Sequence, residues 1–186
     1  FLDLLISKGC IFAWYFHYMP VGLNADTSLL LTSEQRAYMK DRVREIRGIT
    51  GGKELYCIDF QNDGEFAGGC VAGGRIYCHL NDAGDVEPCV FIHYSGANIR
   101  EKSFLECLQQ PLFKLYRKGQ PFNGNHLRPC PMLENPELLP KMVADSGAHS
   151  TDLEAPESAE HLCAKCKEYA AHWKPQAEKL WAEDHS

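Results

Sequence analysis

The sequence has no run of lysine and arginine and no long apolar segment. Its 186 residues carry 19 basic and 25 acidic side chains, a formal net charge of −6, so it lacks the basic surface expected of a nucleic-acid-binding protein. No apolar run approaches the roughly 20 residues that a membrane-spanning helix requires. The N-terminus also lacks the basic leader and cleavage site of a secretory signal. We therefore predict a cytoplasmic protein with neither a nucleic-acid partner nor a membrane partner.

Several catalytic motifs are missing as well. The glycines between Gly68 and Gly74 are not followed by the GK[ST] ending of a phosphate-binding loop, and no Ser-His-Asp or paired-carboxylate spacing stands out. The chain has no initiator methionine, and Phe1 falls inside an amphipathic pattern. This start leads us to expect a piece of a longer protein.

What the chain does contain is typical of a globular protein with unusual cysteine content. Hydrophobic residues make up 45% and charged residues 24%, which excludes a disordered chain. The nine cysteines are an odd number, whereas disulfide frameworks usually use even numbers in short secreted chains. We therefore expect metal binding or redox chemistry in place of disulfides.

The first third of the chain predicts a strand–helix–strand unit. Residues 11–18 form an apolar run typical of a strand buried on both faces of a parallel sheet. Thr32 and Gln35 form a capping box that starts a helix to about Arg47, closed by Gly48 and by Gly51-Gly52. Residues 54–60 predict a second strand. This order implies a parallel pair with a right-handed crossover.

The sequence pattern changes near residue 64, from a strand–helix–strand unit to a region rich in loops and cysteines. Residues 75–87 predict a β-hairpin that turns at Gly84, and short helices are expected after Ser103, Pro111 and Pro136. A long final helix from Glu157 carries the last two cysteines. We predict an α/β part over residues 1–64 and a small cysteine-rich α+β domain over residues 65–186.

The nine cysteines fall into two groups. Four lie at core spacing in predicted strands or helices and are interpreted as buried hydrophobic residues: Cys10, Cys57, Cys78 and Cys107. The other five lie in loops, at strand ends or in a CxxC, where thiolates can converge on a metal: Cys70, Cys89, Cys130, Cys163 and Cys166.

The CxxC formed by Cys163 and Cys166 is the sharpest local signal, but zinc sites, iron–sulfur clusters and redox thiols all use it. A zinc ribbon would need a second CxxC, which the chain lacks. A thioredoxin-like motif would follow a strand, and here a charged helical segment precedes it. His126 and His161 are the best histidine candidates for a site with mixed ligands.

The order of cysteines resembles a known family. Cys70, thirteen residues, Gly84, four residues and Cys89 resemble the opening half of the SPASM-type auxiliary cluster domain of radical S-adenosylmethionine (radical SAM) enzymes. The phrase NDAGDVEPC resembles the hairpin that delivers a cysteine to that cluster. The phrase FHYMPVG is similar to a late strand of the radical SAM barrel, beside the adenosyl group. The resemblance covers residues 11 to 166.

This resemblance implies a fold and a function. Residues 1–64 would be the end of a partial parallel β/α barrel, and residues 65–186 a SPASM-like domain with one auxiliary 4Fe-4S cluster. Met19, Pro20 and Val21 would line the adenosyl site. The full-length oxidoreductase would cleave S-adenosylmethionine at a second 4Fe-4S cluster, with electrons from a flavodoxin or ferredoxin, and act on a peptide or small molecule.

The chain departs from the family pattern in two respects. The family has a compact block of four cysteines after the hairpin, and this chain has only Cys130 and the distant CxxC there. Together with Cys70 and Cys89 these make five candidate ligands, enough for one cluster. The CxxxCxxC loop of the catalytic cluster does not occur in the sequence. Alone, therefore, the chain is expected to be inactive in radical chemistry. Two alternatives remain open, a structural zinc module and a scaffold domain whose cysteines only pack.

Overall fold

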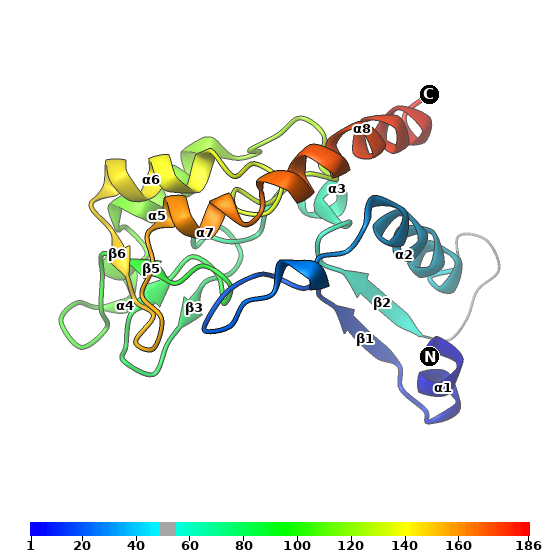
Figure 1. The fold of residues 1–186 in the computed structure, drawn as a ribbon. Helices are drawn as coiled ribbons and strands as arrows, with labels where there is room; N and C mark the ends of the chain where they lie inside the picture. Colours follow the sequence, from blue (N-terminus) through cyan, green and yellow to red (C-terminus); the bar gives the residue numbers. More distant parts are fainter. Residues whose placement is uncertain (49–54) are drawn as a thin grey trace.

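In the computed structural model, residues 1–48 and 55–186 are described (Figure 1). The predicted closing glycines Gly51 and Gly52 and the first predicted residue of the second strand, Glu54, lie outside them. The elements of the described residues follow in chain order: α1 Leu2–Ser7, β1 Phe12–Tyr15, the 3-10 helix η1 Thr27–Leu29, α2 Ser33–Ile46, β2 Tyr56–Asp59, α3 Gly64–Ala67, β3 His79–Leu80, β4 Val86–Glu87, β5 Tyr94–Ser95, α4 Phe104–Cys107, α5 Pro111–Gly119, α6 Leu138–Ser146, β6 His149–Ser150, α7 Ala159–Ala164 and α8 Lys167–Asp184.

The predicted strand–helix–strand unit is present. Strands β1 and β2 pair in parallel, with Phe12 opposite Tyr56 and Tyr15 opposite Asp59. Thr32 is the N-cap of helix α2. Its side chain accepts from the backbone N–H of Gln35, and the Gln35 side chain accepts from the backbone N–H of Thr32. The expected capping box therefore forms. We call α1, β1, α2 and β2 the sheet layer.

One face of the β1–β2 pair is covered and the other is open. Val43 and Ile46 of α2 pack against Leu55 and Cys57, and α1 adds apolar side chains to this small core. On the opposite face the aromatic rings remain half-exposed, with Trp14 at 51% and Tyr56 at 61%. The prediction that this strand is buried on both faces is wrong, because only one face is covered by helices.

Residues 65–186 form the cysteine module, which has little regular sheet. The hairpin is present as the antiparallel pair β3–β4, but β3 spans two residues, so Cys78 lies before the strand and not in its middle. A further antiparallel pair, β5–β6, places Tyr94 opposite Ser150 and was not predicted. The three sheets of the described residues are each two-stranded.

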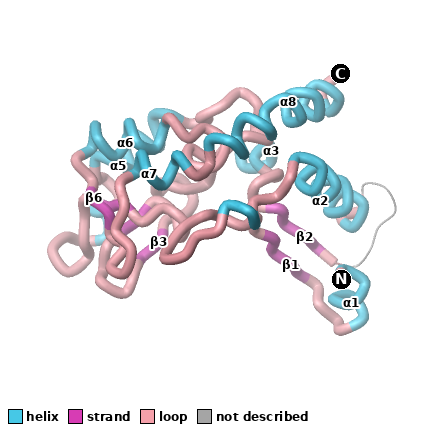
Figure 2. The backbone as a smooth tube through the Cα atoms, viewed as in Figure 1, coloured by secondary structure: helices cyan, strands magenta, loops and turns pink. Residues whose placement is uncertain are grey.

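Helices α5, α6 and α7 lie above these small sheets in the tube view (Figure 2). The predicted long final helix is in fact two helices. Helix α7 ends at Ala164, and α8 begins after its N-cap residue, Cys166. Helix α8 then runs back towards α2 (Figure 1). Within the described parts of the chain, no helix combines the length and apolarity needed to cross a membrane.

Candidate functional site: five thiols and a buried tyrosine

All five cysteines selected from the sequence lie in the main core of the cysteine module. Cys89, Cys163 and Cys166 are buried, whereas Cys70 and Cys130 are half-buried and pack against the same core. Of the remaining cysteines, Cys57 and Cys107 are fully buried in the other two cores, which confirms their interpretation as hydrophobic residues. Cys10 and Cys78 pack at the edges of those two cores.

The side chain of Tyr116, on α5, lies among the thiols. Its hydroxyl is buried and has no hydrogen-bond partner among the described residues. Burial raises the pKa of Tyr116 well above its usual value, and four nearby thiols raise it further: Cys70, Cys130, Cys89 and Cys163. Cys166 interacts with Cys163. The structure therefore places this unpartnered hydroxyl and the five candidate thiols in one core.

Buried polar groups without partners are rare, since such a group loses its bonds to water and gains none in return. A buried hydroxyl without a partner, in a core that also holds several thiols, is what a site for an additional hydrogen-bond acceptor requires. This observation agrees with the donor chemistry of the site, because thiolates bind zinc and iron–sulfur clusters.

Backbone N–H groups act on three of the thiols. The Cys130 sulfur accepts from the amides of Met132 and Leu133, each at 3.4 Å. The Ala72 amide opposes the rise in the pKa of Cys70. The amides of Phe91 and Val90 do the same for the pKa of Cys89. Hydrogen bonds to sulfur stabilise a thiolate and tune the metal group that it holds.

Without a cation the thiols are held protonated. Burial raises the pKa of Cys70 to about 11 and the pKa values of Cys89 and Cys166 to about 12. It also raises those of Cys130 and Cys163. A metal or cluster would have to displace these protons, so binding would become stronger as the pH rises.

The spacing of the side chains sets a limit on this site. The described residues contain no group of three or more His, Cys, Asp or Glu side chains placed as for a single metal ion. Neither histidine candidate adds to the thiols. His161 is exposed and pairs with Glu157 at 2.6 Å, and His126 stacks against Trp181.

Gly73 allows the glycine loop to approach Tyr116. Its φ is +68°, and a Cβ added there would lie 2.4 Å from the Cβ of Tyr116. The glycines after Cys70 therefore serve close packing against the tyrosine as well as the left-handed backbone that L-residues disfavour.

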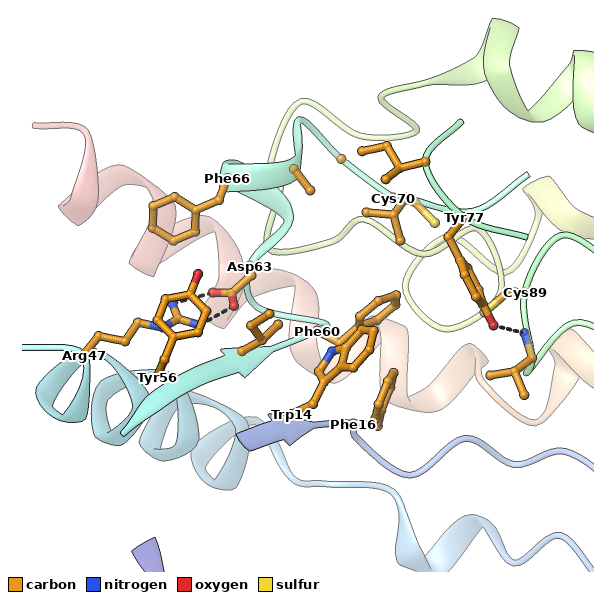
Figure 3. Close-up of a pocket in the computed structure, with 16 residues that line it drawn as sticks. Trp14, Phe16, Arg47, Tyr56, Phe60, Asp63, Phe66, Cys70, Tyr77 and Cys89 are labelled. Carbon is orange, nitrogen blue, oxygen red and sulfur yellow. Dashed lines mark hydrogen bonds and ion pairs between the residues drawn. The ribbon is translucent and has the colours of Figure 1, made fainter. Parts of the chain in front are cut away.

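A groove of about 730 Å³ leads from the open face of the sheet layer to the thiols. Figure 3 shows Trp14, Phe16 and Phe60 facing Tyr77, with Cys70 and Cys89 at the same end and the Arg47–Asp63 ion pair at the other. Sequence reasoning missed this groove. The signal was available in the alternation of Phe12, Trp14 and Phe16, which places aromatic rings on one face of a strand.

The predicted adenosyl-site residues lie between the two regions. Met19 and Pro20 are buried, Val21 is half-buried, and the side chains of Met19 and Val21 pack in the main core. The Met19 sulfur accepts from the amide of Gln61, 3.8 Å away. These residues therefore follow the C-terminal end of β1 and contact the cysteine module.

A polar network lies at the C-terminal ends of the two strands. His17 Nε2 is 3.0 Å from Asp59 Oδ1, and Asn62 donates to the other Asp59 oxygen at 2.7 Å. Burial would raise the pKa of Asp59, but His17, Asn62 and Arg36 outweigh it and lower the pKa. His17 is therefore a buried partner of a carboxylate.

Comparison with protein-family models, with curated proteins and with solved structures gives no match to this chain.

Proposed function

We propose that this chain is part of a radical SAM enzyme and holds an auxiliary 4Fe-4S cluster. Residues 65–186 would be the SPASM-like cluster domain, and residues 1–64 the last βα part of the barrel. The observation that carries the proposal is the buried, unpartnered hydroxyl of Tyr116 among four thiols. The parallel β1–β2 pair beside it agrees with a barrel segment.

In this proposal the cluster ligands come from Cys70, Cys89, Cys130, Cys163 and Cys166. The fourth ligand would be Cys163 or Cys166, which are both buried in the same core as the other thiols. The backbone amides that face the sulfurs would stabilise the thiolates, and the Tyr116 hydroxyl would supply one more donor. The surrounding core would exclude water. When bound, such a cluster carries single electrons.

The aromatic groove supplies a route to the site. Its apolar lining suits an uncharged or aromatic part of a peptide or small molecule, which would then lie against Cys70 and Cys89. In the full-length enzyme, Met19, Pro20 and Val21 would line the site for S-adenosylmethionine. A flavodoxin or ferredoxin would supply electrons.

Anaerobic reconstitution with iron and sulfide tests the proposal directly. A 4Fe-4S site should give brown protein with about four iron and four sulfide per chain. Cys70→Ala and Cys89→Ala should abolish the absorption. Cys78→Ala is the matched control from the same hairpin, and should retain it because that thiol packs in another core.

Two results would overturn the cluster. Zinc bound at about one per chain with no visible absorption would indicate a structural zinc module instead. A chain that folds without metal, and tolerates loss of Cys70 and Cys89 without loss of stability, would indicate a scaffold domain. Both alternatives explain the buried thiols without redox chemistry.

A further inference from the structure

A fully buried ion pair joins the sheet layer to the cysteine module. Arg36, on α2, and Glu134, in the loop that follows Cys130, are both 0% exposed, and Nη1 of Arg36 is 2.6 Å from Oε1 of Glu134. A charged pair at such depth is expensive to desolvate, so it persists where other hydrogen bonds satisfy both partners.

Every nitrogen of the Arg36 guanidinium donates at least one hydrogen bond. Its further hydrogen bonds, all between 2.7 and 2.9 Å, go to Asn62 Oδ1, the Tyr169 hydroxyl and the backbone carbonyls of Gln61 and Leu127. The guanidinium carbon also lies 4.3 Å from the centre of the Trp173 ring. Arg36 is therefore fixed in place and holds Glu134 in turn.

The second oxygen of Glu134 acts on the cysteine loop. Oε2 accepts the backbone N–H of Cys130 at 2.7 Å. The sulfur of Cys130 in turn accepts from the next loop amides, Met132 and Leu133. In the turn formed by residues 130–134, Glu134 thus binds the amide of Cys130, and backbone amides bind its thiol.

Glu134 is also close enough to affect several thiols. After burial, its negative charge contributes to raising the pKa of Cys70, Cys130 and Cys166. Both carboxylate oxygens already have partners, so Glu134 acts on the site through charge and position.

We infer that Glu134, held by Arg36, is a positioning residue that orients Cys130 and makes the metal group at the five thiols harder to reduce. This inference rests on the function proposed above. A negative charge fixed beside a cluster lowers its reduction potential, since potential depends on net charge and on hydrogen bonds near the sulfurs. Because Arg36 belongs to α2, the same pair fixes the sheet layer against the site.

The first test uses the chain before loading with metal. In Glu134→Gln one of the two carboxylate oxygens is replaced by an NH2 donor, so only one of the two positions that face Arg36 and the Cys130 amide still holds an acceptor. We expect the remaining oxygen to turn towards the cation and leave the Cys130 amide without an acceptor. Hydrogen exchange of that amide should become roughly fivefold to tenfold faster, as for the loss of one buried hydrogen bond.

The sequence isolates this amide for measurement. Pro129 and Pro131 flank Cys130 and carry no amide hydrogen, so the Cys130 amide has no exchanging amide on either side of it. Glu154→Gln removes the same charge from an exposed loop and should leave the exchange unchanged. Unchanged exchange in folded Glu134→Gln would overturn the positioning role, whatever the chain binds.

The second test uses the chain loaded with iron and sulfide. Spectroelectrochemical titration of Glu134→Gln should give a midpoint potential shifted to more positive values at equal iron content, with no shift in Glu154→Gln. If Glu134→Gln does not fold, Arg36→Met combined with Glu134→Leu replaces the pair with apolar groups of similar volume. That double variant should also give fast Cys130 exchange, and normal exchange in it would overturn the positioning role.

The two tests separate the failure of this inference from failure of the proposed function. A chain that binds zinc or no metal overturns the cluster but leaves the exchange test intact. An equal potential in wild type and Glu134→Gln, at full iron content, overturns the electrostatic role of Glu134 while the cluster stands.

Discussion

The sheet layer and the cysteine module are held together in different ways. The sheet layer has regular elements and a small core around Val43, Ile46, Leu55 and Cys57, with an open aromatic face. The cysteine module has two-residue strands and short helices, yet its core is much larger and centres on Tyr116. The most regular backbone hydrogen bonding is therefore in the sheet layer, whereas the larger hydrophobic core is in the cysteine module.

Helix α2 meets the cysteine module through several ion pairs. Besides Arg36–Glu134, Lys40 and Arg44 of α2 both pair with Asp184 at the end of α8, at 2.9 Å and 2.6 Å. The buried stripe of α2 is accordingly charged at Arg36 and Lys40 and apolar at Val43 and Ile46. We expect the sheet layer to depend on the module more than the module depends on the sheet layer.

The largest expected effect concerns the centre of the module. Gly73→Ala would combine a left-handed backbone with a 2.4 Å approach to Tyr116, and we expect a loss of more than about 4 kcal/mol in unfolding free energy. Gly147→Ala is matched in φ, also +68°, but a Cβ there meets no atom within 4 Å. It should lose only about 1–2 kcal/mol. Urea denaturation followed by tryptophan fluorescence measures both, and equal losses would contradict the packing at Gly73.

The next effect tests the dependence of one region on the other. Ile46→Ala should cost about 2–4 kcal/mol locally and increase hydrogen exchange in β2 while α5 stays protected. Leu133→Ala, also at a fully buried position, should increase exchange in both. The opposite pattern, with α5 exposed by Ile46→Ala, would show that the two regions unfold as one.

Removing the unpartnered hydroxyl of Tyr116 should change the stability of the fold by less, and the direction of the change tests whether the hydroxyl has a partner. In the metal-free chain, Tyr116→Phe removes a buried group without a partner and should stabilise the fold by about 1 kcal/mol. Tyr94→Phe removes a hydroxyl that donates to the Glu157 carbonyl at 3.0 Å and should destabilise it by about 1 kcal/mol. A loss of stability in both variants would mean that Tyr116 has an acceptor in solution.

The sequence predicted the sheet layer well because its signals are local. The Thr32–Gln35 capping box, the β-rich runs and Gly48 after the predicted helix depend on neighbours in the chain, and they place α2 and the β1–β2 pair correctly. Burial of both strand faces was the error, since it depends on what covers the strand and no local pattern reports that.

In the module, local signals found the cysteines but not the groups that act on them. Positions in loops, at strand ends and in the CxxC selected the five thiols. Tyr116 and Glu134 were missed, because a tyrosine in an amphipathic helix and a glutamate in a proline-rich loop look ordinary in sequence. Their importance arises from contacts between residues far apart in the chain, as Arg36 and Glu134 illustrate.

The smallest expected effect is the pH dependence of the ionic contact at Asp184. Arg44 lowers the pKa of Asp184 to about 2, with a further contribution from Lys40, while burial opposes the shift. A carboxylate with a depressed pKa in the folded state stabilises the fold above its unfolded pKa, and loses that contribution as the pH falls through the folded value. Stability supplied by this contact should therefore decline from about pH 4 to about pH 2. The Asp184→Asn variant should lack this part of the decline in urea denaturation midpoints measured across that range. Because the site is near the surface, the effect is screened and should weaken further at high salt. An Asp184→Asn profile parallel to that of the wild type would show that the end of α8 does not hold the sheet layer to the module.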